Sequence, residues 1–433
     1  MRAAGSSVLP LLVSLAAVAS ALPVDLQAQR GQPASAGPVA RYVKISGDSP
    51  VMLDHVRIID GTGGPAMDDA HVLINHGKIA YAGKTPGADK GSVKHLDLTG
   101  YTVFPGIVGM HDHMYYIARP NFDASGHSEP PLVVPQMPFT SPHLYLGAGV
   151  TTLRTTGSVE PYTDLNLRKQ IDAGELVGPH MDVTAPYLEG PHSPFIQMHQ
   201  LVDVNDARRT VAFWADQGAT SFKAYMNITR AQLGAAIEEA HKRGLKVTGH
   251  LCSVTYPEAA ELGIDNLEHG FFVNTQLDPG KQPDLCPPTS GGPTLAQMKA
   301  NSPDAVALIK LLVDHHVALT STLPVFESSD PRHLHLQPRV IDTMSPPTRE
   351  AYLTTRNLEL SRPVPASGVD RAASFRNGMA LEREFVAAGG LLLAGPDPTG
   401  DGGVLPGYGD QREIELLVDA GFSPLEAIKI ATL

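Results

Sequence analysis

The sequence predicts an α/β protein that combines a (β/α)8 TIM-type barrel with a small N-terminal β-sandwich domain. Short strands separated by turns fill the first part of the chain, and eight apolar strand candidates alternate with helices after residue 101. This alternation favours a parallel barrel over a sandwich of antiparallel sheets. A doubly wound open sheet is the structural alternative, although the glycine-rich nucleotide fingerprint that such sheets often carry is missing from the sequence.

The first 21 residues have the pattern of an export signal. Arg2 supplies a positive start, residues 8–18 are almost entirely apolar, and Ala19-Ser20-Ala21 fits a small-x-small cleavage site. The apolar run is too short to span a bilayer, and no later stretch of the sequence is long and apolar enough. We therefore predict a signal peptide over residues 1–21, no membrane span, and an exported protein that is periplasmic or secreted. A disordered apolar tail is the alternative.

Residues 42–100 are predicted to form the small β domain. A linker rich in Gln, Gly, Pro, Ala and Ser precedes it over residues 22–41. Within the domain, the apolar segments 71–74 and 79–82 flank the turn Asn75-His76-Gly77. Two alternating runs separated by such a turn indicate a β-hairpin.

The barrel is predicted over residues 101–433. Its eight strand candidates are residues 102–109, 151–155, 181–185, 221–225, 246–249, 266–268, 317–320 and 391–394. Two proline-rich segments, 271–303 and 323–371, follow the sixth and seventh strands. We expect them to be long loops, which in a compact barrel are usually functional lids or disordered.

Several helices between these strands have recognisable ends. Thr229 with Gln232 predicts a capping box at the start of one helix, and Gly244 is a suitable stop for it. Ser423 with Glu426 opens the last helix in the same way. These signals predict helices directly before the fifth strand and at the end of the chain.

Composition excludes one class of function and leaves one covalent feature open. The formal net charge of −12 at pH 7 argues against nucleic-acid binding, which requires a basic surface.

Cys252 and Cys286 are the only cysteines in the sequence. An oxidising compartment permits a disulfide, but two cysteines do not define a framework. A disulfide and two unbonded thiols are therefore both open.

Five residues at the predicted carboxyl ends of strands have metal-ligand chemistry. His111 and His113 lie two apart at the end of the first barrel strand, so their side chains point to the same side while Asp112 faces away. The other three follow later strands: His250 the fifth, His269 the sixth and Asp397 the last. Barrel active sites are built at these ends. Four imidazoles and one carboxylate suit zinc or a similar divalent ion, whereas a structural histidine pair is the alternative for His111 and His113.

Lys223 lies on the fourth predicted strand, where a charged amine is costly to bury. A lysine that is carboxylated on its side-chain nitrogen is instead an anion able to bridge two metal ions. A lysine that snorkels from a strand end is the alternative explanation.

These residues and several motifs resemble the amidohydrolase superfamily. The order HDH, Lys, His, His and Asp on strands one, four, five, six and eight carries the resemblance. Further motifs are Val56-Arg57-Ile58-Ile59-Asp60-Gly61-Thr62-Gly63, Phe104-Pro105-Gly106-Ile107-Val108-Gly109-Met110-His111, Gly149-Val150-Thr151-Thr152-Leu153-Arg154 and Glu268-His269-Gly270. The likeness is strongest to the imidazolonepropionase-like branch, which includes metal-dependent dipeptidases and N-acyl amino acid amidases.

The resemblance implies a binuclear site. It implies that His111, His113 and Asp397 hold one buried ion, that His250 and His269 hold a second, more exposed ion, and that carboxylated Lys223 joins them. The implied ions are two divalent cations, with zinc as the expected metal.

Two features depart from the family pattern. The sequence around Asp397 is Ala-Gly-Pro-Asp-Pro, where many relatives have Gly-Thr-Asp. Relatives also usually continue beyond the last helix with strands that return to the small β domain. We therefore expect the sequence to be C-terminally truncated and the sandwich to be incomplete.

We predict a hydrolase that cleaves a carbon–nitrogen bond in an amide, a peptide or a cyclic amide, with dipeptides or N-acyl amino acids as the expected small-molecule substrates. Two ions lower the pKa of a bridging water toward about 7. In the predicted mechanism, Asp397 would accept a proton as the carbonyl is attacked and would then pass it to the leaving nitrogen. Tyr225 faces the same side as Lys223 and is a candidate donor to the developing oxyanion, with a core tyrosine as the alternative. His192, in the loop after the third strand, is a candidate substrate contact, with an uninvolved loop histidine as the alternative.

Two other functions are weighed against this one. Many one-metal deaminases of the superfamily place a proton-shuttling Glu three residues after the fifth-strand His, where this sequence has Ser253. Lys223 would also lack a purpose in such an enzyme. The third hypothesis is a non-catalytic, metal-stabilised binding protein, and the complete ligand set argues against it. A homo-oligomer is possible for any of the three.

Overall fold

The computed structural model describes residues 49–85, 93–114, 140–191, 193, 198–328, 336–361, 371–398 and 403–433. The predicted signal peptide and linker lie outside these residues, as does His192. None of the helices in the described part of the chain is long and apolar enough to cross a bilayer.

The first five strands form one sheet. They are β1 (Val51–Ile58), β2 (Met67–Asn75), β3 (Lys78–Gly83), β4 (Lys94–Asp97) and β5 (Thr102–Val103). The order is β3-β2-β1-β4, with β5 also paired to β1, and the β1–β2 and β2–β3 pairs are antiparallel. His76 and Gly77 join β2 to β3 with positive φ angles of 47° and 69°. Two positive φ values are what a tight two-residue hairpin requires, so the predicted hairpin is confirmed.

Eight further strands pair in parallel. They are β6 (Ile107–Asp112), β7 (Val150–Thr155), β8 (His180–Val183), β9 (Ser221–Ala224), β10 (Lys246–Gly249), β11 (Asn266–Glu268), β12 (Ala318–Ser321) and β13 (Leu392–Ala394). They form a sheet of order β6-β7-β8 and a sheet of order β13-β12-β11-β10-β9. The parallel pairing of an α/β protein is therefore confirmed.

Backbone hydrogen bonds connect these two sheets at both edges. The amide of Ala185 donates to the carbonyl of Ser221 at 3.0 Å, and Thr220 donates back to Val183 at 2.9 Å, which joins β8 to β9. Beyond the end of β13, the amide of Asp397 donates to the carbonyl of His111 on β6 at 3.0 Å. The chain therefore brings its last parallel strand next to its first.

The predicted bounds of the first barrel strand, residues 102–109, are wrong. Residues 102–103 pair with β1 as β5, and the first of the parallel strands, β6, begins at Ile107. Pro105 lies between them and has no amide hydrogen to donate to a ladder, so the run divides at this point.

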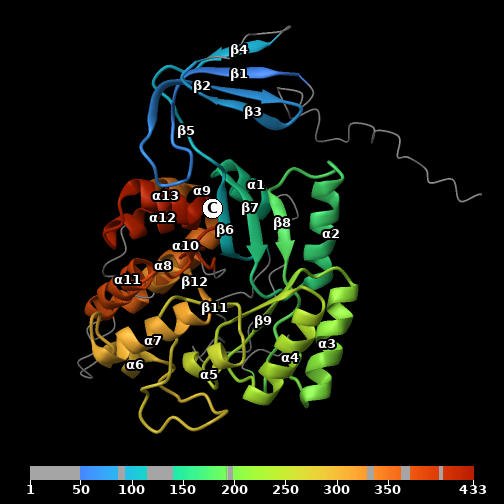
Figure 1. Ribbon diagram of the computed structural model, residues 1–433, viewed down its shortest axis with the longest axis vertical. Coiled ribbons are helices and arrows are strands. Elements are labelled where there is room, and N and C mark those ends of the chain that lie inside the picture. The colour runs from blue at the N-terminus through green and yellow to red at the C-terminus, as the bar shows by residue number, and fades with distance from the viewer. Residues whose placement is uncertain are drawn as a thin grey trace, which may run out of the picture. The chain divides into compact units, whose positions relative to one another are not determined.

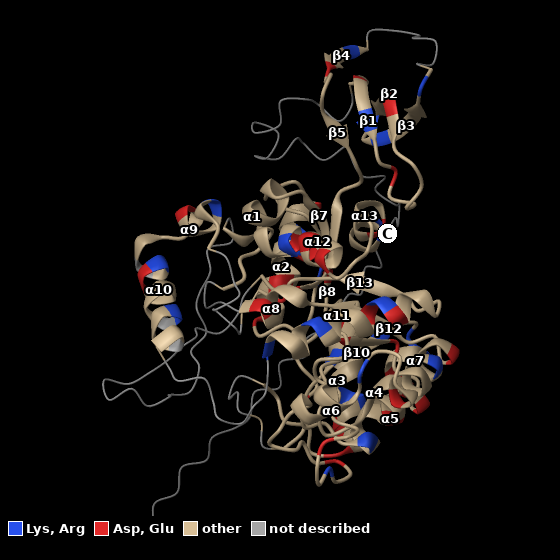
Figure 2. Cartoon of the chain, turned by 90° about the vertical axis from the view of Figure 1, so that its left-hand side faces the viewer, with Lys and Arg blue, Asp and Glu red and all other residues tan. Residues whose placement is uncertain are grey.

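A helix follows each parallel strand along the chain (Figure 1). The helices are α1 (Ser141–Gly147), α2 (Pro161–Asp172), α3 (Val204–Asp216), α4 (Arg230–Lys242), α5 (Tyr256–Glu261), α6 (Gly292–Gln297), α7 (Pro303–Asp314), α8 (Leu323–Ser328), α9 (Pro338–Thr343), α10 (Pro346–Ser361), α11 (Arg371–Ala387), α12 (Tyr408–Asp419) and α13 (Pro424–Thr432). Capping boxes are present at Thr229 and at Ser423, as predicted. Figure 2 shows charged residues of both signs distributed over these helices.

The two predicted long loops contain helices. Helix α6 lies in the first, and helices α8, α9 and α10 lie in the second. Pro338 and Pro346 stand at the first positions of α9 and α10. Proline is well tolerated at a helix start because the amide hydrogen that it lacks has no partner there. Two of the prolines that suggested a loop therefore mark helix starts.

Strands β9 to β12 carry apolar side chains on one face and polar side chains on the other. Phe222, Val247, Leu267 and Leu319 are fully buried in the largest hydrophobic cluster together with residues of the surrounding helices. Burial of one such side chain contributes about 1.5–3 kcal/mol. The next residue on each strand is polar and also buried. These four residues are Lys223, Thr248, Glu268 and Thr320.

Candidate metal centre

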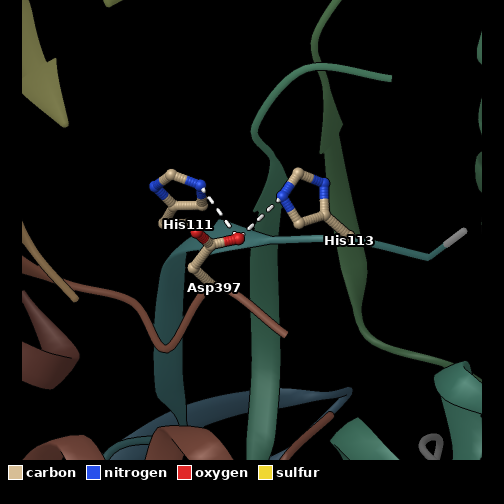
Figure 3. Close-up of side chains that lie close together, drawn as sticks. All are labelled: His111, His113 and Asp397. Carbon is tan, nitrogen blue, oxygen red and sulfur yellow. Dashed lines mark hydrogen bonds and ion pairs between the residues drawn. The ribbon is translucent and has the colours of Figure 1, made fainter. Parts of the chain in front are cut away.

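His111 and His113 point to the same side of β6, as their spacing predicts. Their ring centroids are 5.5 Å apart, and both side chains are buried. Together with Asp397 they form a group, here called the His–His–Asp group, in which one ligand atom from each residue lies within 4.8 Å of the other two. Figure 3 shows both imidazoles turned toward the carboxylate. Asp397 Oδ1 lies 3.1 Å from His113 Nε2 and 3.5 Å from His111 Nε2.

Asp397 reaches this position from an unusual backbone conformation. Its φ angle is +54°, in the left-handed region that non-glycine residues rarely occupy. Its amide hydrogen bond to His111 fixes the backbone beside the first strand. The departure from the Gly-Thr-Asp pattern therefore does not displace the carboxylate from the histidines.

His250 and His269 lie beside the His–His–Asp group. The ring of His269 is 4.7 Å from that of His111 and 4.5 Å from that of His250, measured between centroids. His269 Nδ1 is 2.8 Å from the hydroxyl of Thr322, whereas its Nε2 is buried with no hydrogen-bond partner among the described residues. A buried ring nitrogen without a partner is costly unless it binds a ligand.

Lys223 is buried at the same place. Its Nζ atom lies 3.1 Å from His111 Nε2 and packs over the rings of Tyr187 and Tyr225, at 5.3 Å and 5.8 Å from their centroids. Only 2% of the residue is exposed, so it does not snorkel to solvent. Burial lowers the pKa of its amine to about 8.

The ionisation states at neutral pH are those that metal ligands require. Burial lowers the pKa of His111 to about 4 and also lowers the pKa values of His113, His250 and His269, so all four rings are neutral. Burial opposes the charge of Asp397, but His111 and His113 hold its pKa well below the ordinary value. Neutral imidazoles and an ionised carboxylate are the forms that bind metal.

The described residues fit a divalent metal ion. Nitrogen and oxygen ligands of this type suit zinc and similar ions. The unpartnered Nε2 of His269 and the convergence of the His–His–Asp group are two independent observations in favour of a metal. An ion would place positive charge among neutral rings and an ionised carboxylate.

The other residues singled out from the sequence differ in their position relative to the site. Tyr225 is buried, and its ring centroid is 5.0 Å from that of His250, so it adjoins the site. His192 lies outside the described residues. Asp112 lies beside Asp410 and Tyr145. Burial raises the pKa of Asp112 well above its ordinary value and that of Asp410 to about 7.

Three residues at the site were missed by sequence reasoning: Tyr187, Glu268 and Thr322. The Tyr187 ring covers Lys223, Glu268 contacts His111 Nδ1 at 2.7 Å, and Thr322 contacts His269. Only Glu268 left a signal, because it precedes His269 within a motif of the resembled family.

No protein-family model matches the sequence, and no curated protein matches it. Solved structures do match. A bottromycin amidohydrolase is 21% identical with a TM-score of 0.63, and the match covers 93% of this chain and 80% of that chain. A Xaa-Pro dipeptidase with methionine bound in its active site is 16% identical with a TM-score of 0.60, covering 88% and 87% of the two chains.

An ochratoxinase of A. niger is 17% identical with a TM-score of 0.58, covering 88% of this chain and 82% of that chain. The chain therefore has the fold of the amidohydrolases and dipeptidases that it matches. This likeness concerns the fold.

Proposed function

We propose that the eight parallel strands close into a (β/α)8 barrel and that the sheet β1–β5 belongs to a small sandwich domain. The sequential strand order and the hydrogen bonds at both sheet edges support closure. The candidate ligands His111, His113, His250, His269 and Asp397 lie at or just after the carboxyl ends of β6, β10, β11 and β13, which is where barrel enzymes carry their active sites.

The function that this site supports best is metal-dependent hydrolysis of a carbon–nitrogen bond. The observation that carries the proposal is the buried His–His–Asp group, with His250, His269 and Lys223 beside it. The matched structures include a dipeptidase and an amidohydrolase, so we propose peptides, N-acyl amino acids or other small amides as substrates.

We propose two ions, with zinc as the expected metal. His111, His113 and Asp397 would hold one ion, and His250 and His269 the other. Lys223 would bind both after carboxylation, in which its neutral amine adds to CO2 and releases one proton. The lowered pKa of Lys223 supports this role, because more of the amine is neutral and able to react. When bound, the ions acidify water and polarise the carbonyl of the substrate.

The chain's own residues would manage protons and orientation. Asp397 is ionised and can accept a proton when the carbonyl is attacked, then donate it to the leaving nitrogen. Tyr225 adjoins His250 and would donate a hydrogen bond to the developing oxyanion. We propose that His192 contacts a carbonyl or carboxylate of the substrate. Export, suggested by the pattern of residues 1–21, would place this activity outside the cytoplasm.

The deaminase alternative is not favoured. Ser253 occupies the position where a proton-shuttling Glu is expected, is fully buried, and donates its hydroxyl to the carbonyl of Ile228 at 2.5 Å. It therefore lacks the carboxyl group that this role requires, and its hydroxyl is engaged by the backbone.

The proposal is tested by counting metal and measuring hydrolysis together. Purified protein loaded with zinc or manganese should hold close to two ions per chain and should cleave members of a panel of dipeptides, N-acyl amino acids and cyclic amides. Chelation should abolish this activity. One ion or fewer per chain would refute the binuclear site, and two ions without cleavage of any member would refute the hydrolase.

Asp397→Asn separates catalysis from metal binding. Asparagine keeps the size of the side chain and a coordinating oxygen but cannot take up a proton at neutral pH. Turnover should fall by roughly 10²–10⁴-fold, with the melting temperature retained. The exposed Asp314→Asn is the matched control and should behave as the parent. If turnover only follows metal content, Asp397 is a ligand and the proton shuttle lies elsewhere.

A further inference from the structure

A buried ion pair adjoins the candidate metal centre. Arg154 on β7 and Glu268 on β11 are 7% and 0% exposed, and Arg154 Nη2 lies 2.7 Å from Glu268 Oε1. The two residues are 114 positions apart in the chain.

The second oxygen of Glu268 contacts a candidate metal ligand. Glu268 Oε2 is 2.7 Å from Nδ1 of His111, and the hydroxyl of Thr248 also donates to Oε1. Three donors on three strands therefore hold one carboxylate, which leaves it little freedom to move.

Arg154 is anchored to the same strand that it acts upon. Its Nε donates to the carbonyl of Met110 at 2.9 Å, and Met110 immediately precedes His111 on β6. The guanidinium thus fixes the backbone next to His111 while it pairs with the carboxylate that contacts the ring.

The contact decides which ring nitrogen of His111 faces the site. An ionised carboxylate can only accept hydrogen bonds, so Nδ1 must carry the proton that it donates to Glu268. Nε2 is then the unprotonated nitrogen, and it points toward Lys223 at 3.1 Å and toward Asp397 at 3.5 Å. The lone pair of Nε2 therefore points toward Asp397, the carboxylate of the same group, which is the orientation that a metal ligand needs.

We propose that the Arg154–Glu268 pair is a positioning device that holds His111 in its ligating tautomer and orientation and thereby sets the metal affinity of the site. The inference rests on the proposed function, because it concerns the metal of that site. Arg154 stabilises the charge of Glu268, Glu268 orients His111, and His111 presents Nε2. Carboxylates that hold a ligating histidine in this way typically change metal affinity by 10–100-fold.

A purely structural ion pair would behave differently. Breaking any buried pair leaves an uncompensated charge and destabilises the fold. Only a positioning pair changes the affinity of folded protein for a metal ion. The fold offers a matched control in Glu327, which is 8% exposed and accepts two hydrogen bonds from Arg412 at 2.7 Å and 3.0 Å.

The experiment measures Zn²⁺ affinity by calorimetric titration of metal-stripped, full-length protein. Glu268→Gln should weaken Zn²⁺ binding by roughly 10–100-fold. Glutamine removes the negative charge, and its amide group can turn a donor NH2 toward Nδ1 of His111 in place of an acceptor oxygen. Glu268→Asp keeps the charge but withdraws the carboxylate by one methylene, and should weaken binding less. Glu327→Gln should lower the melting temperature and leave Zn²⁺ affinity unchanged.

The outcomes separate the two proposals. If the parent binds no Zn²⁺, the proposed function fails and this inference fails with it. If the parent binds Zn²⁺ and both Glu268 variants bind it equally well, the inference alone is overturned. Should Glu268→Gln not fold, Glu268→Asp and Thr248→Val decide, since Thr248→Val removes one donor to the carboxylate and leaves its charge. Parent-like affinity in both of these would overturn the inference.

Discussion

Replacing Glu382 with glutamine should stabilise the protein at neutral and alkaline pH. Glu382 lies on α11 and is fully buried. One of its oxygens accepts a hydrogen bond from the hydroxyl of Ser321 at 2.8 Å, and the other has no hydrogen-bond partner among the described residues. Burial raises the pKa of this carboxyl from 4.5 to about 8.

The sign and size of the effect follow from this difference. A carboxyl whose pKa is raised by folding contributes its full stability below its ordinary pKa and loses it as the pH rises through the folded value. Each pH unit between 4.5 and about 8 therefore costs about 1.4 kcal/mol in the free energy of unfolding. By pH 7 the loss attributable to Glu382 is about 3 kcal/mol.

Urea unfolding of the parent and of Glu382→Gln at several values between pH 5 and pH 8 tests this reasoning. Glutamine keeps an oxygen that accepts from Ser321 and does not ionise. The stability advantage of the variant should grow steadily across this range and level off above pH 8. Glu413→Gln should show the same direction, because burial raises the pKa of Glu413 well above its ordinary value. An advantage that is the same at every pH would refute the explanation.

Two further predictions concern the metal bridge and the disulfide. Lys223→Ala should lose metal and activity, and part of both should return when a small carboxylate such as propionate is added. Full activity without this addition would remove the bridging role. Reduction of the Cys252–Cys286 bond should lower the free energy of unfolding by about 2–4 kcal/mol, since the bond spans 34 residues. Melting curves with and without reductant measure this loss, with the double serine variant as the control that should not respond. Unchanged melting of the parent would show that the bond contributes nothing.

Local patterns made part of the fold predictable. The turn at His76 and Gly77 was predicted because a two-residue hairpin needs positive φ angles, which glycine supplies readily. His111 and His113 were predicted to share a side because neighbouring residues of a strand alternate between faces. In each case the information lies within a few residues of sequence.

Contacts between distant residues were not predictable from such patterns. The bond between Glu268 and His111 joins residues 157 positions apart, and its existence depends on how β6 and β11 are placed. The pairing of Cys252 with Cys286 likewise depends on the path of the loop after β11, which no spacing fixes. The helices between residues 323 and 361 were missed because proline starts a helix as readily as it interrupts one.

The backbone at two candidate ligands indicates that their geometry is imposed by the surrounding fold. His269 and Asp397 have φ angles of +70° and +54°, and a left-handed conformation costs roughly 1–2 kcal/mol for a residue with a side chain. Such conformations persist only where the neighbouring structure determines them. Asp397 is held by its amide bond to His111, and His269 precedes Gly270, whose missing side chain leaves room for the buried carboxyl of Glu382. Because these restraints are made by the protein itself, the ligands should keep their orientation when the metal is removed. Metal-stripped protein should therefore rebind Zn²⁺ without refolding.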